Sequence, residues 1–204
     1  MSAGGRFLVL EGGDATGKST QVERLAARLR ERGLEVVTTF EPGATPLGRR
    51  LRALLLDDHE PVDPVAEALL MAADRAQHVA EVVRPTLARG AWLVSDRFLP
   101  SSLTYQGVGR GLGVQEVGVL NVLATAGIEP NLVVVLDLSL DVARQRLGEH
   151  RDRLEAEDEA FALAVHEAYR DLASSHGWVL VNADGTPDEV ADAIWAVVCD
   201  RCAL

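Results

Sequence analysis

The stretch Gly12-Gly13-Asp14-Ala15-Thr16-Gly17-Lys18-Ser19 satisfies the pattern G-x-x-x-x-G-K-[ST], which is typical of phosphate-binding loops. The apolar run 7–10 precedes it, and Val22, Leu25 and Leu29 then recur at helical spacing. Glycine lets such a loop curl so that backbone N–H groups point at phosphate oxygens, and the following helix directs its positive end at the same anion. A chance glycine-rich turn would not explain a Lys-Ser pair placed between a strand and a helix. We therefore predict a strand, a triphosphate-binding loop and a helix.

Within this loop, Lys18 is expected to reach the outer phosphates and the Ser19 hydroxyl to hold Mg²⁺. Asp96 and Arg97 follow another apolar strand, where an acid could hold the same Mg²⁺ and a guanidinium could bind phosphate. A structural ion pair at a strand end is the alternative for these two residues. The predicted ATP-binding residues of the loop are Gly12, Gly13, Asp14, Ala15, Thr16, Gly17, Lys18, Ser19 and Thr20.

Composition and charge exclude several classes of function. The chain has 204 residues, enough for one domain spanning 1–204, and a net charge of −11 without any basic block. These features argue against binding to nucleic acid or anionic membranes. No apolar run approaches the roughly 20 residues of a membrane helix, and the first residues lack a signal-peptide pattern, so we expect a cytoplasmic protein.

Apolar strand patterns alternate with helical patterns along the chain. Strands are predicted at 6–11, 34–39, 91–95, 132–136 and 178–181. Helices are predicted at 18–32, 47–56, 64–89 with a bend or an interruption at Pro85, 101–107, 115–127, 140–147, 155–175 and 187–200. This alternation predicts an α/β fold of three layers, with a five-stranded parallel sheet between helices. Functional groups should lie at the carboxyl ends of the strands.

Three further groups of residues could line a nucleotide site. Ser102, Tyr105 and Gln106 share a helical face that would suit a small, planar, polar ligand. Met71 and Arg75 form an i, i+4 pair, for which a core methionine and a surface arginine are the simpler interpretation. Four arginines around Gly148 could close over transferring phosphates, or could belong to a solvated loop; they are Arg144, Arg146, Arg151 and Arg153.

Together these residues resemble a known family. The marks are the segments 11–20 (EGGDATGKST), 41–43 (EPG), 74–75 (DR), 96–98 (DRF), 101–102 (SS), 105–107 (YQG) and 152–155 (DRLE). In these marks the chain is similar to bacterial thymidylate kinases of the P-loop nucleoside monophosphate kinase superfamily. The resemblance covers nearly the whole chain. It implies a P-loop NTPase fold with a helical lid at about 148–155, ATP-dependent phosphorylation of dTMP to dTDP for dTTP synthesis, and a homodimer.

The resemblance also implies roles for single residues on the acceptor side. Asp14 would read the 3′-hydroxyl and Tyr105 would lie beside the deoxyribose, where a 2′-hydroxyl would be crowded. Arg97, helped by Arg52, would bind the acceptor phosphate. Arg75 would hydrogen-bond the thymine ring, and Ser101, Ser102 and Gln106 would line the pocket for the base and the acceptor phosphate. Met71 stands where the family has a phenylalanine, but its thioether could still cover one face of the base.

On the ATP side, the resemblance assigns Arg146 to the adenine, bordered by Asn182 and Asp184. The catalytic arginine of this family comes from the loop or from the lid. Because Ala15 occupies the loop position, the lid must supply it, and Arg151 and Arg153 are the candidates. Lys18, Arg97 and Asp14 complete the expected catalytic set.

The chain departs from the family pattern at several positions. Phe40 stands where an arginine is usual, and Met71 where a phenylalanine stacks on thymine; Ala44, Pro100, Ala164 and His166 also differ from the usual residues. Two alternatives therefore stay open. One is a related nucleotide or deoxynucleoside kinase with an altered base pocket, and the other is a nucleotide-binding module without catalysis.

Overall fold

The computed structural model describes residues 4–57, 60–147, 152–154 and 156–204. Its strands are β1 (Phe7–Glu11), β2 (Val36–Phe40), β3 (Trp92–Asp96), β4 (Leu132–Asp137) and β5 (Val179–Asn182). Its α-helices are α1 (Lys18–Glu31), α2 (Pro46–Arg52), α3 (Pro64–His78), α4 (Arg84–Ala88), α5 (Leu99–Ser102), α6 (Val114–Thr125), α7 (Leu140–Arg146), α8 (Glu159–His176) and α9 (Pro187–Cys202). Three π-helical segments continue helices: η1 (Ala53–Asp57), η2 (Val79–Val83) and η3 (Leu103–Gly109).

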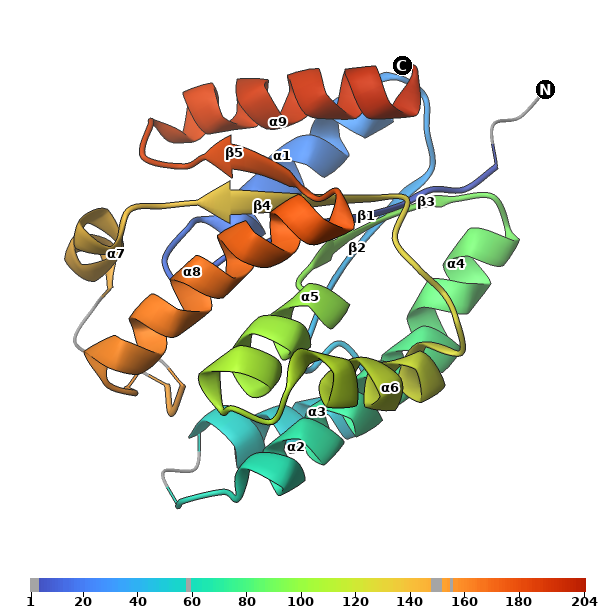
Figure 1. Ribbon diagram of the computed structural model, residues 1–204. Helices are drawn as coiled ribbons and strands as arrows, with labels where there is room; N and C mark the ends of the chain where they lie inside the picture. The colour runs from blue at the N-terminus through green and yellow to red at the C-terminus, as the bar shows by residue number, and fades with distance from the viewer. Residues whose placement is uncertain (1–3, 58–59, 148–151, 155) are drawn as a thin grey trace.

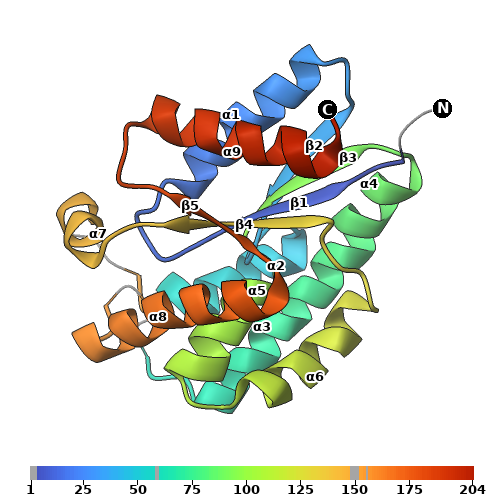
Figure 2. The same ribbon diagram turned by 45° about the horizontal axis from the view of Figure 1, so that its top comes forward.

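The five strands form one parallel sheet in the order β2-β3-β1-β4-β5, which confirms the predicted fold class. Helices α1 and α9 cover one face, and α3, α5 and α8 lie on the other side of the sheet (Figures 1 and 2). The central position of β1 places the end of that strand, and the loop that follows it, between the ends of β3 and β4.

Alternating side chains of the strands build a core on each face, as a sheet buried on both sides requires. Leu8 and Leu10 of β1 pack with Leu25 of α1 and Ile194 of α9. Phe7 and Val9 point the other way, into a cluster with side chains from η2, η3 and α8. The side chains that cover both faces of the sheet are apolar. The polar groups after β1 and β3 therefore lie beyond these cores, at the carboxyl ends of the strands.

Some boundaries differ from the predicted ones for local reasons. Helix α8 begins at Glu159 rather than near 155, because the Asp158 side chain accepts a hydrogen bond from the Phe161 N–H at 2.8 Å and caps the helix there. The long helix predicted at 64–89 is interrupted before Pro85: α3 ends at His78, the π-helical segment η2 follows, and α4 begins at Arg84, so that Pro85, which cannot donate a backbone hydrogen bond, lies in the first turn of a new helix. In the described residues no helix combines the length and the hydropathy needed to cross a membrane.

Candidate active site

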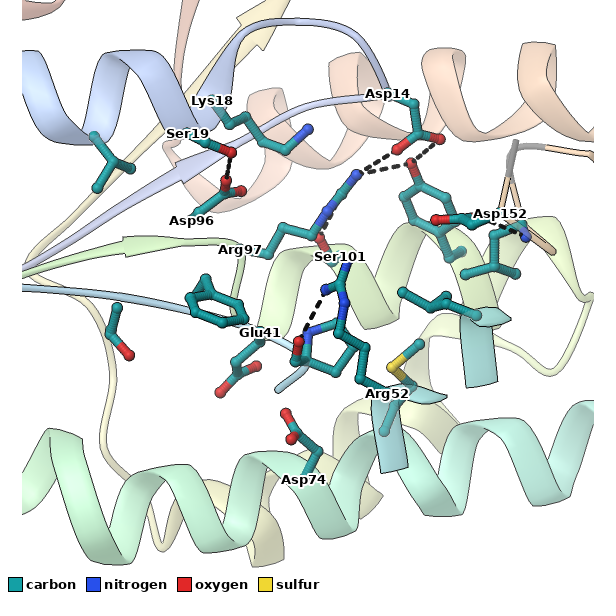
Figure 3. Close-up of a pocket in the computed structure, with 18 of the residues that line it drawn as sticks. Asp14, Lys18, Ser19, Glu41, Arg52, Asp74, Asp96, Arg97, Ser101 and Asp152 are labelled. Carbon is teal, nitrogen blue, oxygen red and sulfur yellow. Dashed lines mark hydrogen bonds and ion pairs between the residues drawn. The ribbon is translucent and has the colours of Figure 1, made fainter. Parts of the chain in front are cut away.

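A cleft of about 890 Å³ opens at the carboxyl ends of the strands, beside the loop after β1 (Figure 3). It brings together most of the residues predicted from sequence. Those that line it are Asp14, Ala15, Gly17, Lys18, Ser19, Thr20, Arg52, Met71, Arg75, Asp96, Arg97, Ser101, Ser102, Tyr105 and Gln106. Residues separated by more than eighty positions therefore share one cavity, as expected for functional groups at the carboxyl ends of parallel strands.

The loop after β1 has the conformation that its glycines permit. Gly12 and Gly17 have φ values of 136° and 85°, and a Cβ atom on Gly12 would lie 2.6 Å from the carbonyl oxygen of Leu136. Inside this loop, the buried Lys18 ammonium donates to the Gly13 carbonyl oxygen at 2.7 Å. Burial, and then the nearby Arg97 guanidinium, lower the pKa of Lys18 to about 8. An anion bound in the loop would favour the charged form of this lysine.

Ser19 and Asp96 meet across the cleft edge, where the Ser19 Oγ donates to Asp96 Oδ2 at 2.6 Å (Figure 3). A hydroxyl and a carboxylate are hard oxygen ligands of the kind that Mg²⁺ binds together with substrate phosphates and water. The pair lies directly beside Lys18, at the first turn of α1. These two residues therefore fit a Mg²⁺ ion that is shared with a nucleotide.

Arg97 lies at the centre of the cleft, in a backbone conformation that is unusual for a residue with a side chain. Its φ is 70°, which turns the guanidinium back from the end of β3 toward the loop after β1. There it donates to Asp14 Oδ1 at 2.7 Å and to the Ser101 Oγ at 3.0 Å, and lies 3.3 Å from the Tyr105 hydroxyl. Tyr105 also donates to Asp14 Oδ2 at 3.1 Å. A cation is thereby held in place beside the phosphate loop.

Glu11 supports this arrangement. From the sequence alone it is recognised only as part of the motif 11–20, with no role assigned to it. Its fully buried carboxylate accepts hydrogen bonds from the Phe98 N–H at 2.8 Å, the Ser101 Oγ at 2.7 Å and the Tyr169 hydroxyl at 2.9 Å. Burial raises the pKa of Glu11, while Arg97 and these donors act against that rise. A carboxylate directly after the apolar run 7–10 is the sequence signal that could have identified it.

Arg75 is a buried residue rather than a surface one. Its Nε donates to Glu41 Oε2 at 2.8 Å, and its two Nη atoms donate to the Ser102 Oγ at 2.9 Å and to the Phe98 carbonyl oxygen at 2.9 Å. The simpler interpretation of the Met71–Arg75 pair is therefore wrong for Arg75, which is 3% exposed and lines the cleft. Sequence reasoning did not identify its partners, which also include Asn121 on α6.

A second acid lies beside this network. Asp74 Oδ1 accepts a hydrogen bond from the Gly43 N–H at 3.1 Å, while its buried Oδ2 has no partner among the described residues. Burial, and then the nearby Glu41 carboxylate, raise the pKa of Asp74 to about 6. Glu41 itself also accepts from His78 Nδ1 at 2.7 Å. Glu41, Asp74 and Arg75 thus line the cleft, and the fully buried His78 contacts Glu41 from behind the lining.

The predicted phosphate and adenine contacts lie at separate edges of the site. Arg52 reaches the cleft and donates to the Pro42 carbonyl oxygen at 3.0 Å. Away from the cleft, Arg146 Nη1 donates to the Ala183 carbonyl oxygen at 3.3 Å, which places it next to Asn182 and Asp184. The residues expected around adenine are therefore neighbours in space.

Arg153 is not among the residues that line the cleft. Its guanidinium lies 2.6 Å from Glu67 Oε2 and donates through Nε to the Leu55 carbonyl oxygen at 2.8 Å. In this conformation its partners belong to α3 and η1 and not to the phosphate loop. The other candidate, Arg151, lies outside the described residues. So do the other residues of 148–151, which include Gly148, and Glu155.

Comparisons with known proteins give matches over nearly the whole chain. A family model described as "Thymidylate kinase" matches residues 10–194. The chain is 50% identical to a thymidylate kinase of Synechococcus sp. strain WH7803, with 98% of each chain covered. It is 44% identical to a thymidylate kinase of Parasynechococcus marenigrum, covering 97% of this chain and 98% of the relative. It is also 44% identical to a thymidylate kinase of Chromohalobacter salexigens, covering 98% of this chain and 97% of the relative.

Proposed function

The chain belongs to the thymidylate kinase family, and we propose that the cleft beside the phosphate loop is where it transfers phosphate from ATP to dTMP. The reaction of this family is the ATP-dependent phosphorylation of dTMP to dTDP, and this chain is an enzyme that carries it out. One observation supports the location most strongly: Lys18 of the loop, Arg97 after β3 and Arg75 of α3 line the same cleft. A donor site and an acceptor site must be adjacent for direct transfer.

We propose that Lys18 and Arg97 provide most of the electrostatic stabilisation of the transferred phosphoryl group. Lys18 would donate to the outer phosphates of ATP, and Arg97 to the acceptor phosphate, so that both cations face the charge spread over the transferred group. The acceptor oxygen is already anionic, so little proton chemistry is needed. Ser19 and Asp96 would hold Mg²⁺, which supplies charge neutralisation on the outer phosphates when it is bound.

We propose that the acceptor nucleoside occupies the side of the cleft opposite Ser19. Met71 and Arg75 of α3, with Ser102 and Gln106, would enclose the base; Asp14 and Tyr105 would face the sugar; Arg52 and Ser101 would assist Arg97 at the phosphate. The mutual hydrogen bonds of Asp14, Tyr105 and Arg97 support this arrangement, because they tie the expected sugar and phosphate contacts together. Arg146, Asn182 and Asp184 would border the adenine.

The lid arginine, the single kinase domain 1–204 and a cytoplasmic location stay predictions. The lid at about 148–155 is supported by the sequence resemblance to the family. Arg151 and Arg153 stay the two candidates for the catalytic cation. Replacing each in turn would separate them: the catalytic residue should lower turnover at saturating ATP and dTMP more than it lowers nucleotide affinity.

We also propose a homodimer that forms through α3 and α6. Exposed apolar side chains gather on these two neighbouring helices, which pack against each other: Val65, Leu69, Val119, Val122 and Leu123. Leu123 is 83% exposed and Val119 70% exposed, which is unusual for large apolar residues on adjacent turns of one helix. An isologous contact between two copies would bury this surface.

The experiment that tests the proposal is steady-state phosphorylation of dTMP, dUMP, thymidine and other monophosphates with Mg-ATP. We expect clear preference for dTMP and loss of transfer in Lys18→Ala. Preference for another acceptor would instead support a base pocket altered at Phe40 and Met71, both of which line the cleft. Binding of both nucleotides without transfer would support a module that has lost catalysis.

A further inference from the structure

The buried carboxylate of Glu67 joins three segments that are distant in sequence. Glu67 lies in the first turn of α3 and is 0% exposed. Its Oε1 accepts from Gln106 Nε2 at 2.9 Å, and its Oε2 accepts from Arg110 at 3.1 Å and from Arg153 at 2.6 Å. Arg110 also donates through Nε to Oε1, at 3.3 Å. Both oxygens of this carboxylate therefore have two donors each.

These contacts keep the carboxylate ionised. Burial acts to raise the pKa of Glu67, but the hydrogen bonds from Gln106, Arg110 and Arg153 hold it below its usual value. An ionised carboxylate only accepts hydrogen bonds, so Gln106 must present its amide nitrogen to Glu67 and turn its amide oxygen away. Glu67 thereby selects one of the two orientations of the Gln106 amide.

Through Arg153, the same carboxylate fixes the segment that precedes α8. The Arg153 N–H donates to the Leu56 carbonyl oxygen at 3.1 Å, and the guanidinium bridges Leu55 and Glu67. The residues on either side of Arg153, Asp152 and Leu154, line the cleft together with Gln106. Figure 3 shows Asp152 on the opposite side of Arg97 from Lys18 and Ser19, which is the side proposed for the acceptor.

We propose that Glu67 is a positioning residue of the acceptor pocket, which orients the Gln106 amide and, through Arg153, holds Asp152 and Leu154 in the pocket wall. This inference rests on the proposed acceptor site, which it deepens. Glu67 itself does not line the cleft, and so it acts through its neighbours. Its effect should therefore fall on dTMP and not on ATP, whose phosphates are expected near Lys18 on the other side of Arg97.

The test is binding of dTMP and of Mg-ADP, each measured by isothermal titration calorimetry, to the full chain and to Glu67→Gln. The glutamine keeps the shape but turns one acceptor oxygen into a donor that faces the arginines. We expect the Kd for dTMP to rise about 10-fold or more, while the Kd for Mg-ADP stays within about twofold. Glu81→Gln, which changes an exposed carboxylate in η2, is the matched control and should alter neither value.

Two further measurements separate positioning from a merely structural role. Glu67→Asp keeps the charge but withdraws it by one methylene, so it should raise the Kd for dTMP above the wild-type value, though less than Glu67→Gln does. Its comparison with the wild type tests the inference even if Glu67→Gln folds poorly. In steady-state assays of the folded variants, KM for dTMP should rise more than turnover falls. Unchanged dTMP affinity in a folded Glu67 variant, or an equal loss of dTMP and Mg-ADP affinity, would overturn the inference. Failure of the wild-type chain to bind dTMP would overturn the proposed function instead.

Discussion

The Arg97 guanidinium donates to Asp14 Oδ1 at 2.7 Å, which joins the end of β3 to the loop after β1 at the centre of the cleft. Both side chains are partly buried, 17% and 26% exposed respectively, so the ion pair is screened less by water than a surface pair. Because Asp14 also accepts from Tyr105, one carboxylate fixes the expected phosphate and sugar contacts together.

Replacing Asp14 with asparagine should therefore impair the acceptor side of the reaction. The amide keeps the shape but loses the charge that holds Arg97, and we expect kcat/KM for dTMP to fall about 10-fold or more. The measurement is a coupled ADP-release assay with dTMP and with its 3′-deoxy analogue. If Asp14 reads the 3′-hydroxyl, the wild-type preference for dTMP over the analogue should narrow in the variant. Asp171→Asn, an exposed change on α8, should leave both substrates unaffected.

The hydrogen bond between Ser19 and Asp96 leads to a prediction about Mg²⁺. Asp96→Asn removes a negative charge beside the expected ion, so we expect the Mg²⁺ concentration for half-maximal activity to rise about 10-fold. Titration of Mg²⁺ at fixed ADP should show the same weakening by calorimetry, independently of turnover. An unchanged Mg²⁺ requirement would mean that the pair is a structural contact at the strand end.

Asp74 predicts how stability changes with pH. Its pKa is about 6 in the folded protein, above the ordinary value near 3.8, so the folded state holds a proton that the unfolded chain releases. Stability should thus fall as pH rises from about 4 to 6 through this group, by at most about 3 kcal/mol. Asp74→Asn mimics the protonated form and should raise the free energy of unfolding at pH 8, with a smaller gain at pH 5. Urea denaturation at the two pH values measures both gains, and equal gains would exclude this titration.

Local patterns predicted the fold class and the strand, loop and helix around Lys18, because these elements are specified by neighbours in sequence. The strand–loop–helix around Lys18 is specified by glycines and apolar spacing within residues 7–29. The parallel sheet follows from the alternation of strands and helices.

The remaining contacts could not be predicted because they join residues far apart in the chain. Arg75 looked like a surface residue by its helical position, and its burial depends on Glu41 of another segment. The family resemblance made Arg153 a candidate lid arginine that would contact the transferring phosphates. The structure instead places its guanidinium against the carboxylate of Glu67, eighty-six positions away. Periodicity does not encode such pairs, although Glu11, Glu41 and Glu67 share one signal, a carboxylate among apolar neighbours.

The exposed apolar surface of α3 and α6 gives the last prediction. Leu123→Asp would place an unpaired charge at the proposed contact, twice in a symmetric dimer, so we expect the dimer Kd to rise about 100-fold or more. Leu163→Asp, an equivalent change at an exposed leucine of α8, is the matched control and should leave the dimer intact. Analytical ultracentrifugation of the wild type and both variants measures the effect. Because α3 carries Met71 and Arg75 on its cleft side, the monomer formed by Leu123→Asp should also bind dTMP more weakly than the wild type. A wild-type chain that is monomeric at micromolar concentration, or a Leu123→Asp variant that is as dimeric as the control, would contradict the assignment of this surface.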